Sequence, residues 1–158
     1  MRGEVGQIRQ VQWSLNIQVG SGITLPNQIP GNLPMPLPSP IYGIDHVAVT
    51  ITDEARAKAF YGRFLGLEEV ARPASFDFPG AWYRAGDMMI HLVGKPQADA
   101  ISNRHFCFKV SDCRAVMAHC EAAGLEMQRE SHKIPGILRF FIRDPDGNRI
   151  EFQGADVD

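Results

Sequence analysis

The sequence predicts an α+β fold made of two βαβββ modules, because this chain of 158 residues contains an internal repeat. His46 and His105 each open a run of alternating side chains that ends in Thr-Asp or Ser-Asp and leads into a helical pattern. His91 and Glu151 occupy a second repeated segment, and the offsets of the two pairs are 59 and 60 residues. We expect the modules to form a curved, mostly antiparallel sheet, cupped as a half-barrel, with the helices outside.

The composition indicates one domain that is able to bury a core, with 44% apolar residues, 22% charged residues and a net charge of −2. This balance gives no support for binding to nucleic acid or to a membrane surface. The chain has no run of about 18 apolar residues and no apolar secretory signal. Three cysteines without a paired pattern favour a reducing compartment, and we expect a cytoplasmic protein.

Residues 1–40 differ from the remainder and are interpreted as an N-terminal extension. Residues 11–19 alternate without a break and predict a strand, whereas residues 23–40 contain six of the eleven prolines and favour a semi-rigid linker. The extension is either poorly ordered, which we favour, or a strand that docks on a sheet edge of its own or a neighbouring subunit. The repeated domain is expected at 41–158.

Module 1, at about 43–95, begins with a strand that the alternation predicts at 46–51. Thr52-Asp53 can cap a helix there, and its apolar stripe continues to a stop at Gly66. Three short strands are expected to complete the module, at about 68–72, 81–84 and 88–93.

Module 2, at about 103–154, repeats this order with a strand at 105–110 and a helix at 113–123. The turn Asp144-Pro145-Asp146-Gly147 is well specified, because proline fixes φ and glycine accepts a positive φ. The remaining strands are expected at about 126–130, 138–143 and 149–152.

Four side chains that are able to bind a metal ion are expected on one face of this sheet. Their immediate strand neighbours are apolar and must face the helices, so the four face the concave side; they are His46, His91, His105 and Glu151. A slip of one residue would bury the glutamate against a helix, which is costly. Imidazoles and a carboxylate suit one divalent ion per chain, whether Zn²⁺, Ni²⁺, Fe²⁺, Co²⁺ or Mn²⁺.

Three segments carry a family resemblance: DHVAV at 45–49, FYGRFLG at 60–66 and DPDGNRIE at 144–151. They resemble the vicinal oxygen chelate superfamily, which includes glyoxalase I, fosfomycin-resistance proteins, extradiol dioxygenases and bleomycin-resistance proteins. The likeness is greatest to glyoxalase I-like proteins. It covers about residues 43–154 and implies the paired βαβββ fold.

The resemblance also implies roles for the four side chains. His46 and His105 take the positions of metal ligands in the family. Glu151 corresponds to the residue that in glyoxalase I both binds the metal and moves the substrate proton, so it is the expected catalytic residue. The remaining ligand position holds glutamate in glyoxalase I but His91 in this chain.

The resemblance and the donor set predict a metal-dependent lyase or isomerase of the lactoylglutathione lyase type. Four ligands leave two open sites on an octahedral ion, which suits a small substrate that chelates through vicinal oxygens and passes through an enediolate-type intermediate. Two alternatives stay open. An extradiol-type dioxygenase needs a third open site, and a non-catalytic antibiotic-binding protein of the bleomycin-resistance type usually needs no metal ligands.

Strand alternation and the family likeness place further side chains in the same cavity as substrate-binding residues: Trp82, Arg84, Met89, Cys107, Arg139 and Phe141. We also expect a homodimer, because each module leaves an open sheet edge and family members of this size commonly complete their barrels across a two-fold axis. Each site can then draw ligands from both chains.

Overall fold

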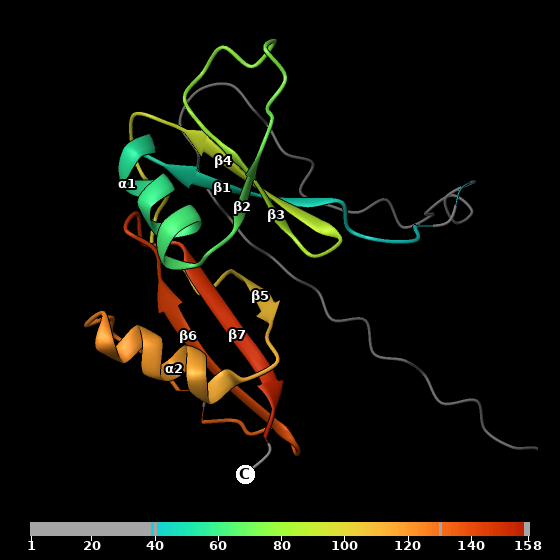
Figure 1. Cartoon of the computed structure of the whole chain (residues 1–158), viewed down its shortest axis with the longest axis vertical. Coiled ribbons are helices and arrows are strands. Elements are labelled where there is room, and N and C mark those ends of the chain that lie inside the picture. Colours follow the sequence, from blue (N-terminus) through green and yellow to red (C-terminus); the bar gives the residue numbers. More distant parts are fainter. Residues whose placement is uncertain (1–38, 40, 130, 157–158) are drawn as a thin grey trace, which may run out of the picture. The chain divides into compact units, whose positions relative to one another are not determined.

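A computed structural model describes Ser39 and the residues 41–129 and 131–156 (Figure 1). The strand expected at 11–19 lies outside the described residues, as does the proline-rich linker at 23–40 apart from Ser39. The helices and strands of the described residues all belong to the unit that begins at Gly43. Among the described residues, no helix is long and apolar enough to span a bilayer.

Module 1 forms a four-stranded sheet. Its elements are β1 (His46–Ile51), α1 (Glu54–Lys58), the π-helix η1 (Ala59–Phe64), β2 (Glu68–Val70), β3 (Trp82–Ala85) and β4 (Met88–Gly94). The strand order is β1-β4-β3-β2, with β1 parallel to β4 and the other two pairings antiparallel. The first strand of the module is therefore an edge of its sheet.

Module 2 forms a three-stranded sheet. Its elements are β5 (His105–Lys109), α2 (Cys113–Ala122), β6 (Ile137–Arg143) and β7 (Arg149–Ala155). The order is β5-β7-β6, with β5 parallel to β7 and β6 antiparallel to it. The strand expected at 126–130 is reduced to one bridge, in which Gln128 exchanges both backbone hydrogen bonds with Phe141. This segment offers Met127 as its only apolar side chain, so little burial supports longer pairing.

The predicted α+β fold of two repeated modules is confirmed, and three of the five strand pairings are antiparallel. Among the described residues the strands pair in two sheets, and no ladder joins β1 to β5 (Figure 1). Each module consequently presents its first strand with one unpaired edge.

Both helical segments begin at the predicted aspartates. The side chain of Asp53 accepts a hydrogen bond from the backbone N–H of Arg56, and that of Asp112 accepts one from Ala115. In module 1 the helix widens after α1 into η1, where the backbone N–H of Leu65 donates to the carbonyl of Phe60. The segment buries both Phe60 and Tyr61, whereas α1 buries one residue.

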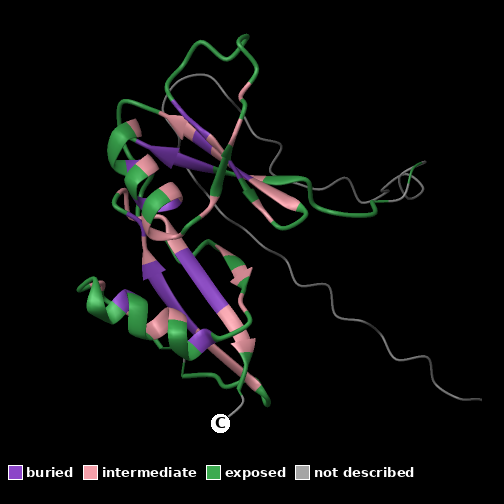
Figure 2. Cartoon of the chain, viewed as in Figure 1, coloured by how far each residue is buried: buried purple, intermediate pink, exposed green. Residues whose placement is uncertain are grey.

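The buried core residues come from the strands of both sheets and from the helical segments, where Figure 2 shows purple stretches. The apolar strand neighbours of the predicted ligands are buried there, as the alternation predicts: Ile90, Leu92, Ile150 and Phe152. Val47 and Phe106 are partly buried against the same core. The alternation in β4 and β7 thus has the predicted direction.

The turn between β6 and β7 is built around the buried carboxylate of Asp144. This carboxylate accepts hydrogen bonds from the backbone N–H groups of Asp146 and Asn148 and from the side-chain amide of Asn148. Gly147 has a φ of +86°, a left-handed conformation that favours glycine. The turn sequence therefore encodes a preformed acceptor site, as its residue types predict.

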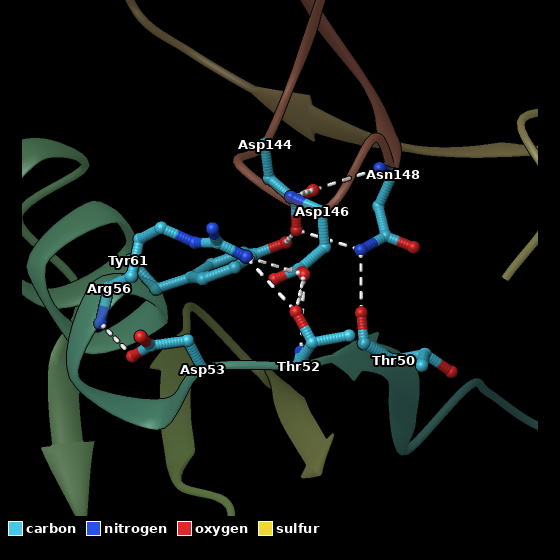
Figure 3. Close-up of polar contacts among 8 residues, drawn as sticks. All are labelled: Thr50, Thr52, Asp53, Arg56, Tyr61, Asp144, Asp146 and Asn148. Carbon is cyan, nitrogen blue, oxygen red and sulfur yellow. Dashed lines mark hydrogen bonds and ion pairs between the residues drawn. The ribbon is translucent and has the colours of Figure 1, made fainter. Parts of the chain in front are cut away.

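This turn also connects module 2 to module 1 (Figure 3). The hydroxyl of Tyr61 donates to Asp144 over 2.8 Å, and burial followed by the Asp144 charge raises the pKa of Tyr61, which keeps the donor protonated. The amide of Asn148 donates to the carbonyl of Thr50 on β1, also over 2.8 Å. We call Tyr61, Asp144, Asn148 and Thr50 the inter-module network.

Asp146 adds a second connection from the same turn. Its side chain accepts hydrogen bonds from the backbone N–H and the hydroxyl of Thr52, just after β1, and it forms an ion pair with Arg56 at 2.8 Å (Figure 3). The Asp146 side chain is 2% exposed, so this ion pair is desolvated on its acidic side.

We expect Asp144→Ala to lower the free energy of unfolding by about 3–5 kcal/mol, because it removes a buried charge and leaves its donors unpaired. Tyr61→Phe removes one donor and should cost about 1 kcal/mol. Urea denaturation followed by circular dichroism, at one fixed protein concentration, measures both values.

Asp87→Ala is the matched control, because Asp87 is exposed in the corresponding turn of module 1, between β3 and β4. It should change the free energy of unfolding by no more than about 0.5 kcal/mol. Equal losses for the Asp87 and Asp144 variants would show that the inter-module network contributes nothing specific.

Candidate metal centre

His46 and His91 form a first half-site on the adjacent strands β1 and β4. Their imidazole rings stack with a centroid distance of 4.1 Å and an interplanar angle of 18°. Trp82 on β3 is the cross-strand partner of His91 and stacks on it at 4.1 Å and 8°. Because β4 lies between β1 and β3, His91 is the middle ring of three, which we call the ring stack.

The ring stack affects the charge of its middle ring. Desolvation lowers the pKa of His91, the nearby His46 lowers this pKa further, and Asp45 opposes both effects more weakly. The neutral imidazole that results is the form that coordinates a metal ion.

His105 and Glu151 form a second half-site on β5 and β7. Nε2 of His105 lies 2.9 Å from one carboxylate oxygen of Glu151, and the other oxygen accepts a hydrogen bond from Arg139 over 3.2 Å. Glu151 is 6% exposed, so its charge depends on these partners. Phe141, its cross-strand neighbour on β6, is buried and packs edge-on against the His105 ring.

Two of the three histidines make a hydrogen bond that determines which ring nitrogen is left for a metal. Nδ1 of His46 lies 2.8 Å from the Asp45 carboxylate, and Nδ1 of His105 lies 2.9 Å from the backbone carbonyl of Asn103. Both arrangements leave Nε2 as the coordinating atom, as is usual for metal-binding histidines. Nε2 of His105 and a carboxylate oxygen of Glu151 lie 2.9 Å apart, and both are atoms that bind divalent transition metals, so these donors fit a divalent ion.

The two half-sites are separate in one chain. The structure pairs His46 with His91 in one sheet and His105 with Glu151 in the other. The described residues contain no group of three or more His, Cys, Asp or Glu side chains with the arrangement of a metal site. Each half-site therefore supplies two of the four predicted ligands.

Three of the predicted substrate-binding residues border a predicted ligand directly. Trp82 belongs to the ring stack, Arg139 donates to Glu151, and Phe141 packs against His105. In each module an aromatic ring thus packs against one of the predicted histidine ligands.

The other predictions in module 1 have different surroundings. Met89 is the register partner of His46 across the parallel pair of β1 and β4. Arg84 is exposed and pairs with Glu68, which is also exposed. The structure therefore gives Met89 a place beside the first half-site and leaves Arg84 in a surface ion pair.

Cys107 is the register partner of Glu151 across β5 and β7. Desolvation and then the Glu151 carboxylate raise the pKa of the Cys107 thiol to about 11. The thiol is therefore protonated at neutral pH and does not act as a nucleophile there.

The sequence-based set of substrate-binding residues does not include two arginines that the structure places beside the half-sites. The guanidinium of Arg149 stacks on the ring of Phe141 at 3.7 Å. Arg72 lies over Phe78 at 4.5 Å in the loop before β3, where Phe76 packs edge-on against Trp82. The repeat pairs Arg149 with Met89, and this difference between the modules is the signal that could have identified it.

Comparison with known proteins gives a match over most of this unit. A model of the Glyoxalase/Bleomycin resistance protein/Dioxygenase superfamily matches residues 43–152. The crystal structure of a putative glyoxalase family protein from Bacillus anthracis is 32% identical, with a TM-score of 0.70, over 76% of this chain and 100% of that one.

Two further crystal structures have similar folds. A lactoylglutathione lyase from Agrobacterium tumefaciens is 26% identical with a TM-score of 0.58, over 73% of this chain and 96% of that one. The E126Q mutant of the fosfomycin resistance protein FosX from Listeria monocytogenes, in complex with Mn(II) and 1S,2S-dihydroxypropylphosphonic acid, is 16% identical. Its TM-score is 0.65, over 74% of this chain and 95% of that one, which shows a likeness of fold alone.

We expect Arg139→Met to lower the free energy of unfolding by about 2–4 kcal/mol, because it leaves the buried Glu151 carboxylate without its charged donor. Arg84→Met is the control, since it removes the same kind of ion pair from an exposed position and should cost less than about 1 kcal/mol. Urea denaturation of the metal-free proteins measures both. Losses of equal size would mean that Arg139 does not stabilise the buried charge.

Proposed function

Because the chain belongs to the Glyoxalase/Bleomycin resistance protein/Dioxygenase superfamily, we propose that it is a metal-dependent lyase or isomerase. Its substrate is a small molecule that presents two vicinal oxygens. The observation that carries the proposal is the buried carboxylate of Glu151, held between His105 and Arg139 on the concave face. The similarity to a lactoylglutathione lyase supports this reaction class.

The proposed metal ligands are the two half-sites together: His46, His91, His105 and Glu151. Three imidazole nitrogens and one carboxylate are donors that divalent transition metals prefer. The FosX complex contains Mn(II), which supports a divalent ion on this fold. When bound, such an ion stabilises the negative charge that develops on a substrate oxygen.

Glu151 is proposed to carry the substrate proton. Its two oxygens have different partners, His105 and Arg139, so the carboxylate has one defined orientation. A carboxylate held in this way can take a proton from a carbon next to a carbonyl group and return it to the neighbouring carbon. His91 occupies the repeat position of Glu151, so the proposed site contains a single carboxylate base.

We propose that the complete site forms between two chains of a homodimer. Within one chain the half-sites lie in different sheets, and the inter-module network joins the end of β1 to the β6–β7 turn. Bringing the half-sites together inside one chain would break these buried hydrogen bonds, which is costly.

The sheet edges favour the same arrangement. Both β1 and β5 are edge strands, and each opens with a proposed ligand, His46 in β1 and His105 in β5. A two-fold axis that sets β1 of one chain beside β5 of the other covers both edges. It also brings the first half-site of one chain to the second half-site of its partner, twice in each dimer.

A subunit-mixing experiment tests the metal ligands and the shared site together. The wild-type dimer should hold one divalent ion per chain. We expect neither His46→Ala/His91→Ala nor His105→Ala/Glu151→Ala to retain it, because each variant lacks one half-site. After random subunit exchange between equal amounts of the two variants, about a quarter of the wild-type metal content should return, since each mixed dimer has one intact site. Elemental analysis with light scattering gives the metal content per dimer.

The mixing experiment separates the two parts of the proposal. Metal-free mixtures, together with a metal-loaded wild-type protein, would place the whole ligand set in one chain and contradict the shared site. Full metal retention in both double variants would contradict the ligand assignment itself.

Glu151→Gln tests the proton-transfer role. The amide keeps the shape and one weaker oxygen ligand, and the three histidines remain, so we expect the metal to be retained. Turnover should fall by a factor on the order of 10²–10⁴ in a screen of hemithioacetals and acyl-CoA esters. Glu121→Gln, on the exposed face of α2, is the control and should leave turnover unchanged. Wild-type turnover by the Glu151 variant would mean that this residue is a ligand only.

A further inference from the structure

Three arginines lie on the concave face of module 2, and two of them already have partners. Arg139 donates to the Glu151 carboxylate and to the backbone carbonyl of His132. Arg143 donates to the carbonyl of Gly147 over 2.7 Å. The terminal nitrogens of these two guanidinium groups therefore already donate to acceptors of the protein, and only Nε of Arg139 is buried without a partner, as is Nε of Arg149.

Arg149 is different. Its guanidinium carbon lies 3.7 Å from the centroid of the Phe141 ring, which fixes the plane of the group. Its Nε is buried without a hydrogen-bond partner, and one terminal nitrogen donates a long hydrogen bond of 3.5 Å to the carbonyl of Asn103. Among the described residues, no carboxylate lies within 4.0 Å of it. Arg149 thus carries an oriented but uncompensated positive charge.

The position of Arg149 links the second half-site to a cavity. Arg149 is the register partner of His105 across β5 and β7. In the single chain both residues line a cavity of about 840 Å³ with Arg104 and Asn148. Its opposite wall is formed by the β1 residues 47–49, part of the edge strand that the proposed dimer sets beside β5 of the partner. The cavity does not include Glu151, so it lies beside the proposed reacting centre.

The charges around this cavity favour an anion. Its one acidic side chain, Asp99, already accepts from the hydroxyl of Thr50 over 2.7 Å and pairs with Lys95 over 3.3 Å. Arg104 and Arg149 add two positive charges. A guanidinium beside a proposed cationic metal is repelled by it unless an anion lies between or next to them.

The internal repeat indicates that Arg149 has a role that is specific to module 2. In module 1 the residue that corresponds to Arg149 is Met89, the register partner of His46. The fold therefore needs no arginine at this position, because the other copy of the same unit has an uncharged side chain there. Arg149 is therefore not required by the fold of the repeated unit.

We infer that Arg149 binds an oxyanion, a carboxylate or a phosphonate, at the end of the substrate remote from its vicinal oxygens. The inference rests on the proposed function, because it takes the vicinal oxygens to lie at the half-sites. A planar guanidinium held against Phe141 presents its remaining N–H donors in a fixed fork, which matches two oxygens of such an anion. The oxyanion lies against Arg149 and beside His105, on the module 2 side of the site, and compensates the charge of Arg149.

The test uses the Mn²⁺-loaded full-length protein and two kinds of chelating probe. Acetohydroxamate presents vicinal oxygens alone, and a series of hydroxamates with a terminal carboxylate or phosphonate on linkers of increasing length adds the anion. Water-proton relaxation measures the displacement of Mn²⁺-bound water by each probe. We expect the best anionic probe to bind the wild type about tenfold more tightly than acetohydroxamate.

Three variants locate the effect. Arg149→Gln should lose the advantage of the anionic probes while binding acetohydroxamate like the wild type, which also shows that the variant is folded. Arg149→Lys keeps the charge but not the planar fork, and should retain part of the advantage. Arg63→Gln, which removes an exposed charge at the end of η1, should retain all of it.

The outcomes distinguish this inference from the proposed function. If the wild type binds neither Mn²⁺ nor acetohydroxamate, the proposed function and the inference both fail. If acetohydroxamate binds but no anionic probe in the series gains affinity, or if the gain persists in Arg149→Gln, the inference alone is overturned. The better binder of the carboxylate and phosphonate series identifies the anion.

Discussion

The buried carboxylate of Asp144 is the group on which the arrangement of the two modules depends. It organises the β6–β7 turn through backbone N–H donors and accepts a hydrogen bond from Tyr61, a residue of the other module. A desolvated charge is stable only when its donors are in place, so turn and module contact form together. The side-chain amide of Asn148 donates both to Asp144 and to the carbonyl of Thr50, so the same turn also holds the end of β1.

The two modules contribute different pairs of side chains to the half-sites. Each module holds a pair of side chains on a parallel strand pair, β1 with β4 and β5 with β7. The first pair has stacked rings with a desolvated imidazole, whereas the second has an imidazole in contact with a buried carboxylate. Module 1 thus contributes two imidazoles, whereas module 2 contributes one imidazole and the single carboxylate of the four proposed ligands.

Local patterns in the sequence were sufficient for most of the fold. Strand β1 begins and ends where the alternation predicts, and both helix caps are the expected aspartates, because these features depend on neighbours within a few residues. The segment around Gln128 failed as a strand, since pairing there depends on burial that its polar side chains do not supply. The separation of the half-sites was not predictable either, because it rests on a contact between residues 83 positions apart.

The two modules also differ in the charged side chains that they present to a bound ligand. In the repeat, Glu151 of module 2 corresponds to His91 of module 1, and Arg149 corresponds to Met89. The two modules therefore differ at both pairs of positions. A ligand that touches both copies meets a carboxylate and a guanidinium on one side only, and rotating it by half a turn does not restore its contacts. Under the proposed function, such a face distinguishes the two prochiral sides of the carbonyl group of the substrate, because both charged residues belong to module 2.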